Sequence, residues 1–152
     1  GFKIYISILD ELEIFNVIKT DNDLRAVKGK GTYSVLGFSR CNNYIGKELL
    51  PTEQIQEKSV SAKRALYNAN IKTLDKIRSE YSIFLSKVDL ENDLDEVMHD
   101  RLVTLLGENS PVNYLQDSKH YHMVELIEKL SDTDCKTIYN HYNFACLKEV
   151  AE

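Results

Sequence analysis

The pattern of hydrophobic and polar positions predicts helices that surround two short strands. Residues 2–12 carry apolar side chains at helical spacing, in a stripe broad enough for a buried helix. Residues 15–19 and 83–85 are short, mostly apolar runs, and each is followed by acidic residues. Such runs are typical of strands covered on both faces, so we expect both in one small parallel sheet flanked by helices.

The chain between these two strands is expected to be a loop followed by helices. Residues 25–32 form a basic, glycine-punctuated segment that predicts a mobile loop. Residues 33–45 fit a helix that is interrupted near Gly37, and residues 59–81 fit either one long helix or two helices with a break near Asn70.

The chain after Glu91 has a helical pattern throughout. Gly107 is a candidate C-cap and Ser131 a candidate N-cap, and the helical stretches are residues 94–106, 119–130 and 131–150. We find no internal repeat and no linker. The sequence therefore predicts an α/β fold in a single domain over residues 1–152, with an α/β part (1–90) and an all-helical C-terminal part (91–152).

Composition places the chain among ordinary soluble globular proteins. Of its 152 residues, 43% are hydrophobic and 28% charged, and 19 basic residues against 24 acidic ones give a formal net charge of −5. No broad basic field indicates a nucleic-acid binder, and no apolar run approaches the roughly 20 residues that cross a bilayer. Three widely spaced cysteines favour a reducing cytoplasm over a disulfide framework.

Two pairs of carboxylates carry the main chemical signal. Asp21 and Asp23 follow the first predicted strand, and Asp89 and Glu91 follow the second. In extended chain, residues two positions apart point to one side, and the carboxyl ends of neighbouring parallel strands share an edge. Four converging carboxylates need a cation, and all-oxygen ligands suit Mg²⁺ or Mn²⁺. Metal-assisted phosphodiester chemistry is a natural use of such a site.

The same acidic residues have a simpler explanation. Aspartates after a strand commonly solvate a loop or cap the next helix. The sequence pattern alone leaves both interpretations open, although two strand-terminal pairs are harder to explain in this way than one.

At these residues the chain resembles the Toprim domain of the OLD (overcoming lysogenization defect) family of ATP-dependent endonucleases. The resemblance is strongest to the large subunit of Gabija-type anti-phage systems, and it runs through residues 17–24, residues 85–94 and residues 117–119. It implies a DNA endonuclease that depends on Mg²⁺ or Mn²⁺ and acts in anti-phage defence. Its metal-binding and catalytic residues would be Asp21, Asp23, Asp89 and Glu91, with Lys119 contacting the scissile phosphate.

The resemblance also implies partners and missing parts. It implies a homo-oligomer and a helicase-like partner subunit. The family's first strand ends in a glutamate next to glycine, and this sequence has no Glu-Gly pair; it also lacks a phosphate-binding G-x4-G-K-[ST] motif. Since the chain also begins without Met, we expect a piece of a longer protein in which ATP binds an upstream domain. This piece alone should cleave DNA poorly.

Weaker signals complete the picture. The basic segment around Arg25, Lys28 and Lys30, together with Lys19, could hold a DNA backbone, but a solvated loop is an equally simple explanation. His120 and His122 would face apart on a helix and form a poor metal site. The competing hypothesis for function is a non-catalytic helical module for interaction or oligomerisation, with its acidic loops on the surface.

Overall fold

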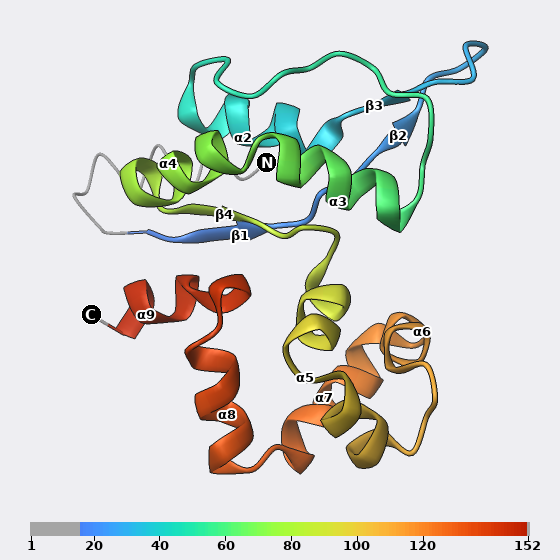
Figure 1. Cartoon of the computed structure of the whole chain (residues 1–152), viewed down its shortest axis with the longest axis vertical. Coiled ribbons are helices and arrows are strands. Elements are labelled where there is room, and N and C mark those ends of the chain that lie inside the picture. Colours follow the sequence, from blue (N-terminus) through green and yellow to red (C-terminus); the bar gives the residue numbers. More distant parts are fainter. Residues whose placement is uncertain (1–15, 152) are drawn as a thin grey trace.

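A computed structural model describes residues 16–151 as a small parallel sheet between two groups of helices (Figure 1). Strand β1 (Ile18–Thr20) pairs in parallel with β4 (Ile83–Leu85), so that Lys19 lies opposite Phe84. The predicted α/β class, with a small flanked sheet and a helical C-terminal stretch, is confirmed. The helix predicted over residues 2–12 falls outside the described residues.

The connection from β1 to β4 supplies the helices on one side of the sheet. These are α2 (Leu36–Ile45), α3 (Val60–Ala69) and α4 (Ile71–Tyr81). Of the two alternatives for residues 59–81, two helices is correct. Asn70 has φ −117° and ψ 17°, outside the helical range, and its side-chain amide donates to the carbonyl of Leu66 at 2.9 Å. Asparagine competes with helical hydrogen bonding in this way, which explains the break.

The predicted loop over residues 25–32 lies within a β-hairpin: its first two residues form a strand, and residues 27–32 form the connecting loop. Strands β2 (Arg25–Ala26) and β3 (Tyr33–Ser34) pair antiparallel, and Tyr33 continues the pairing with Ile55 through two hydrogen bonds of 2.8 and 2.9 Å. Gly29 and Gly31 adopt φ values of +76° and +64° in the turn, where glycine avoids a steric penalty. Two-residue strands are too short for an alternating sequence pattern, so the prediction missed them.

The predicted interruption of the next helix near Gly37 is also wrong. Helix α2 runs without a break from Leu36 to Ile45, and Gly37 lies in its first turn. A Cβ atom at Gly37 would lie 2.7 Å from the carbonyl oxygen of Asp21 and 2.9 Å from Cα of Asn22. The glycine therefore permits close approach of two backbones and does not end the helix.

The C-terminal half is helical, as predicted. Helix α5 begins before the predicted residue 94 because Asp89 caps it, and Gly107 ends it with φ +69°. Ser131 and Asp134 form a capping box at α8, which confirms the predicted N-cap. Helix α6 was not predicted as a separate element, and a short 3-10 turn interrupts the last predicted helix. The elements are α5 (Leu90–Leu106), α6 (Pro111–Gln116), α7 (Lys119–Lys129), α8 (Asp132–Tyr139), η1 (Tyr142–Phe144) and α9 (Cys146–Ala151).

Two hydrophobic clusters lie on the two sides of the sheet. One includes Phe38, Tyr67 and Ile83, and the other includes Leu102, Leu115 and Leu126. The η1 turn links the halves, since the Arg78 guanidinium of α4 donates to the carbonyl of Tyr142 at 2.7 Å. Across residues 16–151, no helix is both long and apolar enough to span a membrane.

Candidate functional site

The two predicted acidic pairs lie at the same edge of the β1–β4 sheet. The first acidic segment (residues 21–23) follows β1 and the second acidic segment (residues 87–91) follows β4. Backbone pairing continues beyond the strands, because the Ser86 amide donates to Thr20 O at 2.8 Å and the Asn22 amide donates to Val88 O at 3.0 Å. The structure thus brings the two segments side by side.

Asp21 is electrostatically coupled to the other predicted site residues. Burial raises the pKa of the Asp21 carboxyl above its usual value, and the charges of Asp23, Asp89 and Glu91 raise it further, while Lys119 opposes them. All four carboxylates and the lysine therefore share one local field. A cation placed among them would relieve their mutual repulsion.

Glu91 and Lys119 form an ion pair within this group of charges, and the two side chains differ in their exposure to solvent. Lys119 Nζ lies 2.9 Å from Glu91 Oε1, and the side chains are 54% and 0% exposed, respectively. The contact with Glu91 raises the pKa of the Lys119 ammonium, with burial opposing the shift. Glu91 Oε2 is also buried and has no hydrogen-bond partner in the described part of the chain. Such an unsatisfied buried oxygen is costly, and it is the kind of atom a metal ion satisfies.

Asp89 caps helix α5 and also faces the cluster. Its Oδ1 accepts from the backbone amide of Asn92 at 2.8 Å and from the Asn92 side chain at 2.9 Å, and its Oδ2 accepts from Gln116 Nε2 at 2.9 Å. Helix capping was the simpler of the two explanations for Asp89 in the sequence, and the structure shows that Asp89 does cap helix α5. A carboxylate has about four lone-pair positions, so these contacts leave Oδ2 able to accept again.

Asp23 is paired with a cation that sequence patterns did not single out. Arg40 of α2 donates to Asp23 Oδ2 at 3.1 Å and to the Thr20 hydroxyl at 2.8 Å. Its side chain is 28% exposed. Arg40 is 17 positions from Asp23, and no short motif joins them. Only the packing of α2 on the sheet edge makes the pair.

The donor set fits a hard divalent cation, although the carboxylates do not form a closed cage. Among residues 16–151, no three His, Cys, Asp or Glu side chains stand together as ready metal ligands. The available donors are carboxylate oxygens, which suit Mg²⁺ or Mn²⁺. The unpartnered Oε2 of Glu91 supplies a buried donor at the same place.

The four basic residues that the sequence suggested as DNA contacts do not lie together in the structure. Arg25, Lys28 and Lys30 are exposed on the β2–β3 hairpin, which follows directly on the first acidic segment. Lys19 does not join them. Its ammonium lies 2.6 Å from Asp93 and donates to the carbonyl of Asn143 at 3.0 Å. The idea that Lys19 contacts DNA is therefore wrong, because a buried carboxylate holds it.

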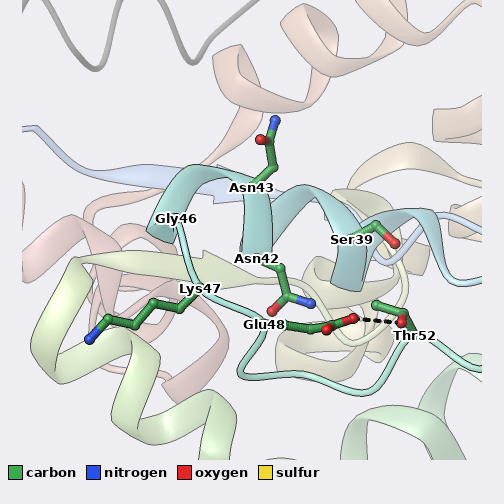
Figure 2. Close-up of a pocket in the computed structure, with 7 residues that line it drawn as sticks. All are labelled: Ser39, Asn42, Asn43, Gly46, Lys47, Glu48 and Thr52. Carbon is green, nitrogen blue, oxygen red and sulfur yellow. Dashed lines mark hydrogen bonds between the residues drawn. The ribbon is translucent and has the colours of Figure 1, made fainter.

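A polar hollow of about 440 Å³ is lined by helix α2 and the loop that follows it (Figure 2). Asn42 lines it, but its amide already donates to Leu50 O at 2.9 Å and accepts from the Leu49 and Leu50 amides at 3.1 and 2.9 Å. Across the hollow, the Thr52 hydroxyl donates to Glu48 at 3.0 Å. These groups satisfy one another, so the hollow does not contribute to the candidate site.

The remaining chemically interesting side chains have structural roles. His122 stacks on Tyr114 at 3.8 Å between ring centroids, and its Nδ1 lies 2.6 Å from the Tyr114 carbonyl oxygen. The cysteines in residues 16–151 are free thiols, and burial raises the pKa of Cys41 to about 12. Such a thiol is a poor nucleophile at neutral pH.

Comparison with known proteins identifies a similar enzyme. The chain is 39% identical to Endonuclease GajA of Bacillus cereus (strain VD045) over an alignment of 160 residues, which covers 98% of this chain and 28% of that protein. No family model matches the chain. The resemblance to Gabija-type endonucleases that the acidic motifs indicated is confirmed. The chain spans little more than a quarter of the length of this relative.

Proposed function

We propose that the present chain, which resembles the Gabija-type endonucleases, carries a divalent-metal site for phosphodiester hydrolysis in DNA. The observation that supports it most directly is the buried Glu91 carboxylate, which is paired with Lys119 and shares a field with Asp21 and Asp89. The similar protein is named an endonuclease, which agrees with this chemistry. The match covers 28% of that endonuclease, so we propose that DNA cleavage also requires parts of the longer protein that lie outside these 152 residues.

Each site residue has a distinct task in this proposal. Asp21, Asp23, Asp89 and Glu91 would hold Mg²⁺ or Mn²⁺, which when bound orients the phosphate and activates water. The Lys119 ammonium is a cation at neutral pH like any lysine, the contact with Glu91 raises its pKa further, and its side chain is 54% exposed. Its ammonium can therefore stabilise the charge that develops on the phosphoryl oxygens.

The β2–β3 hairpin would hold the DNA backbone beside this site. Arg25, Lys28 and Lys30 are exposed on it, and the acidic segment ends only two residues before Arg25. The net charge of −5 disfavours general attraction to DNA. Binding would therefore depend on this local basic surface and on the metal.

The wider setting is proposed from the family resemblance of the acidic motifs alone. We propose anti-phage defence in the cytoplasm as the biological role, a homo-oligomer as the working form and a helicase-like subunit as a partner. ATP would bind a domain outside these 152 residues.

Manganese binding by the chain tests the proposed site. Electron paramagnetic resonance measures free Mn²⁺ during a titration, and we expect saturable binding that Asp21→Asn and Glu91→Gln each weaken at least about tenfold. Glu53→Gln, which changes an exposed carboxylate in the α2–α3 connection, is the matched control and should bind as the parent chain does. Absence of binding, or equal binding by all variants, would refute the proposal.

A second candidate is the helical interaction module, and one surface favours it. Tyr121, Val124 and Ile127 lie at helical spacing on α7 and are 73%, 43% and 60% exposed. In this alternative the two acidic segments would be surface loops that bind no metal ion. Self-association that Ile127→Ser abolishes, combined with no Mn²⁺ binding, would favour the module over the nuclease.

A further inference from the structure

We propose that Asn22, the residue between the two aspartates of the first acidic segment, is a positioning residue for the metal site. Together with Gly37, it fixes the backbone of this segment and so the positions of Asp21 and Asp23 at the sheet edge. This inference rests on the proposed function, because it assigns the source of the geometry on which metal binding would depend.

Asn22 ties three parts of the fold together. Its side chain is fully buried. Its Nδ2 donates to Lys87 O at 3.0 Å and to Lys63 O at 3.1 Å, and its backbone amide donates to Val88 O at 3.0 Å. Asn22 therefore links the first acidic segment to both the second acidic segment and helix α3.

The direction of the Asn22 side chain also explains where its neighbours point. Successive side chains in extended backbone project to opposite sides. Asn22 points into the protein and is completely buried, whereas Asp21 and Asp23 on either side remain partly accessible. Anchoring the central residue inward therefore holds both carboxylates on the outer side, at the sheet edge.

Gly37 holds the same segment from the other side by an independent contact. Its backbone amide donates to Asp23 O at 3.0 Å. A Cβ at this position would lie 2.7 Å from Asp21 O, 2.9 Å from Asn22 Cα and 3.0 Å from Asp23 N, and these are backbone atoms that cannot rotate away. An alanine at residue 37 would displace the whole first acidic segment.

Small displacements matter because metal sites tolerate only about 0.5 Å of error in ligand placement. Groups that orient metal ligands commonly contribute 10- to 100-fold to metal affinity. Asn22 and Gly37 contact backbone and contribute no carboxylate, so their effect on a metal would act wholly through the position of Asp21 and Asp23.

The matched control for Asn22 is Asn42. It is also a buried asparagine, and its side chain makes three hydrogen bonds to the backbone of Leu49 and Leu50. These bonds lie at the far end of α2 from the acidic segments. Removing either amide should lower the unfolding temperature to a similar degree, but only Asn22 should affect the metal.

The experiment compares Mn²⁺ dissociation constants for the 152-residue chain and its variants, measured by electron paramagnetic resonance well below each unfolding temperature. We expect Asn22→Ala and Gly37→Ala to weaken Mn²⁺ binding by about 10- to 100-fold, and Asn42→Ala to change it less than about twofold. Gly37→Ala is the second variant if Asn22→Ala does not fold, since it displaces the same segment without removing any hydrogen-bonding group of Asn22.

The outcomes separate this inference from the function on which it rests. If the parent chain binds no Mn²⁺, the proposed metal site fails and the positioning role fails with it. If the parent binds Mn²⁺ through Glu91 but Asn22→Ala and Gly37→Ala bind equally well, only the positioning role is overturned. The same holds if Asn42→Ala weakens binding as much, because the effect would then be one of general stability.

Discussion

The ammonium of Lys119 lies 2.9 Å from a carboxylate of Glu91 that solvent does not reach, although the lysine side chain itself is 54% exposed. The two members of the pair therefore differ in what they lose when the other is removed. Lys119 can be hydrated by water, whereas Glu91 would keep a buried negative charge close to Asp21 and Asp89.

Lys119→Met should destabilise the metal-free chain more than Glu91→Gln does. Removing the cation leaves an uncompensated buried carboxylate, and we expect a loss of about 1–3 kcal/mol, discounted for the exposure of the lysine. Glu91→Gln removes the buried charge and should change stability by less than about 1 kcal/mol. Thermal unfolding with and without Mn²⁺ measures both effects. Mn²⁺ should stabilise Lys119→Met more than it stabilises Glu91→Gln, which binds the ion more weakly; the reverse order of stabilities without metal would contradict the electrostatic argument.

The Lys19–Asp93 pair should be a larger contributor to stability. Its N–O distance is 2.6 Å, and its side chains are 20% and 2% exposed. Lys19→Met leaves a buried aspartate without its cation, so we expect a loss of about 2–4 kcal/mol in urea unfolding. Lys129→Met breaks the exposed pair with Glu125, which are 3.5 Å apart, and should cost less than about 1 kcal/mol. Equal losses in the two variants would show that burial does not set the difference.

The basic hairpin should determine the salt dependence of DNA binding. Lys28→Ala combined with Lys30→Ala should weaken binding to duplex DNA and reduce the slope of log K against log salt by about 1.8, or about 0.9 per lost phosphate contact. The unfolding temperature should stay the same, since both side chains are exposed at the hairpin tip. The control removes two exposed charges from α4, at Lys72 and Lys76, and should leave the slope unchanged. Fluorescence anisotropy at several salt concentrations gives the slopes, and an unchanged slope in the hairpin variant would exclude it as a DNA contact.

Stability should fall in acid partly through Asp134. The Arg101 side chain and the Ser131 backbone amide donate to its carboxylate and hold the pKa of Asp134 below its usual value. An acid whose pKa is lower in the folded state adds stability above the unfolded-state pKa of about 3.9, and this stability disappears as pH falls through the folded-state value. Asp134→Asn should therefore lower the unfolding temperature at pH 7 and flatten its decline below about pH 4. A variant with the same decline as the parent chain would show that other carboxyls dominate.

The sequence by itself determined the parts that depend on neighbours along the chain. The apolar runs at residues 15–19 and 83–85, which overlap the strands Ile18–Thr20 and Ile83–Leu85, and the caps at Gly107 and Ser131 follow from local propensity and local hydrogen bonding, whereas the sequence left one helix or two open around Asn70. The resemblance carried by the acidic motifs was confirmed by the 39% identity to an endonuclease.

Tertiary structure decided which residues share the site and which do not. Arg40 reaches Asp23, Gln116 reaches Asp89 and Asn22 reaches Lys87 only because α2, α6 and β4 pack around one sheet edge. Lys19 looked like part of a basic loop, but it pairs with Asp93, which is 74 positions away. Such contacts join segments that are far apart in sequence, and neither periodicity nor propensity carries information about them. The carboxylates could be found from their positions after two strands, but the groups that hold, cap and neutralise them depended on how the chain folds back on itself.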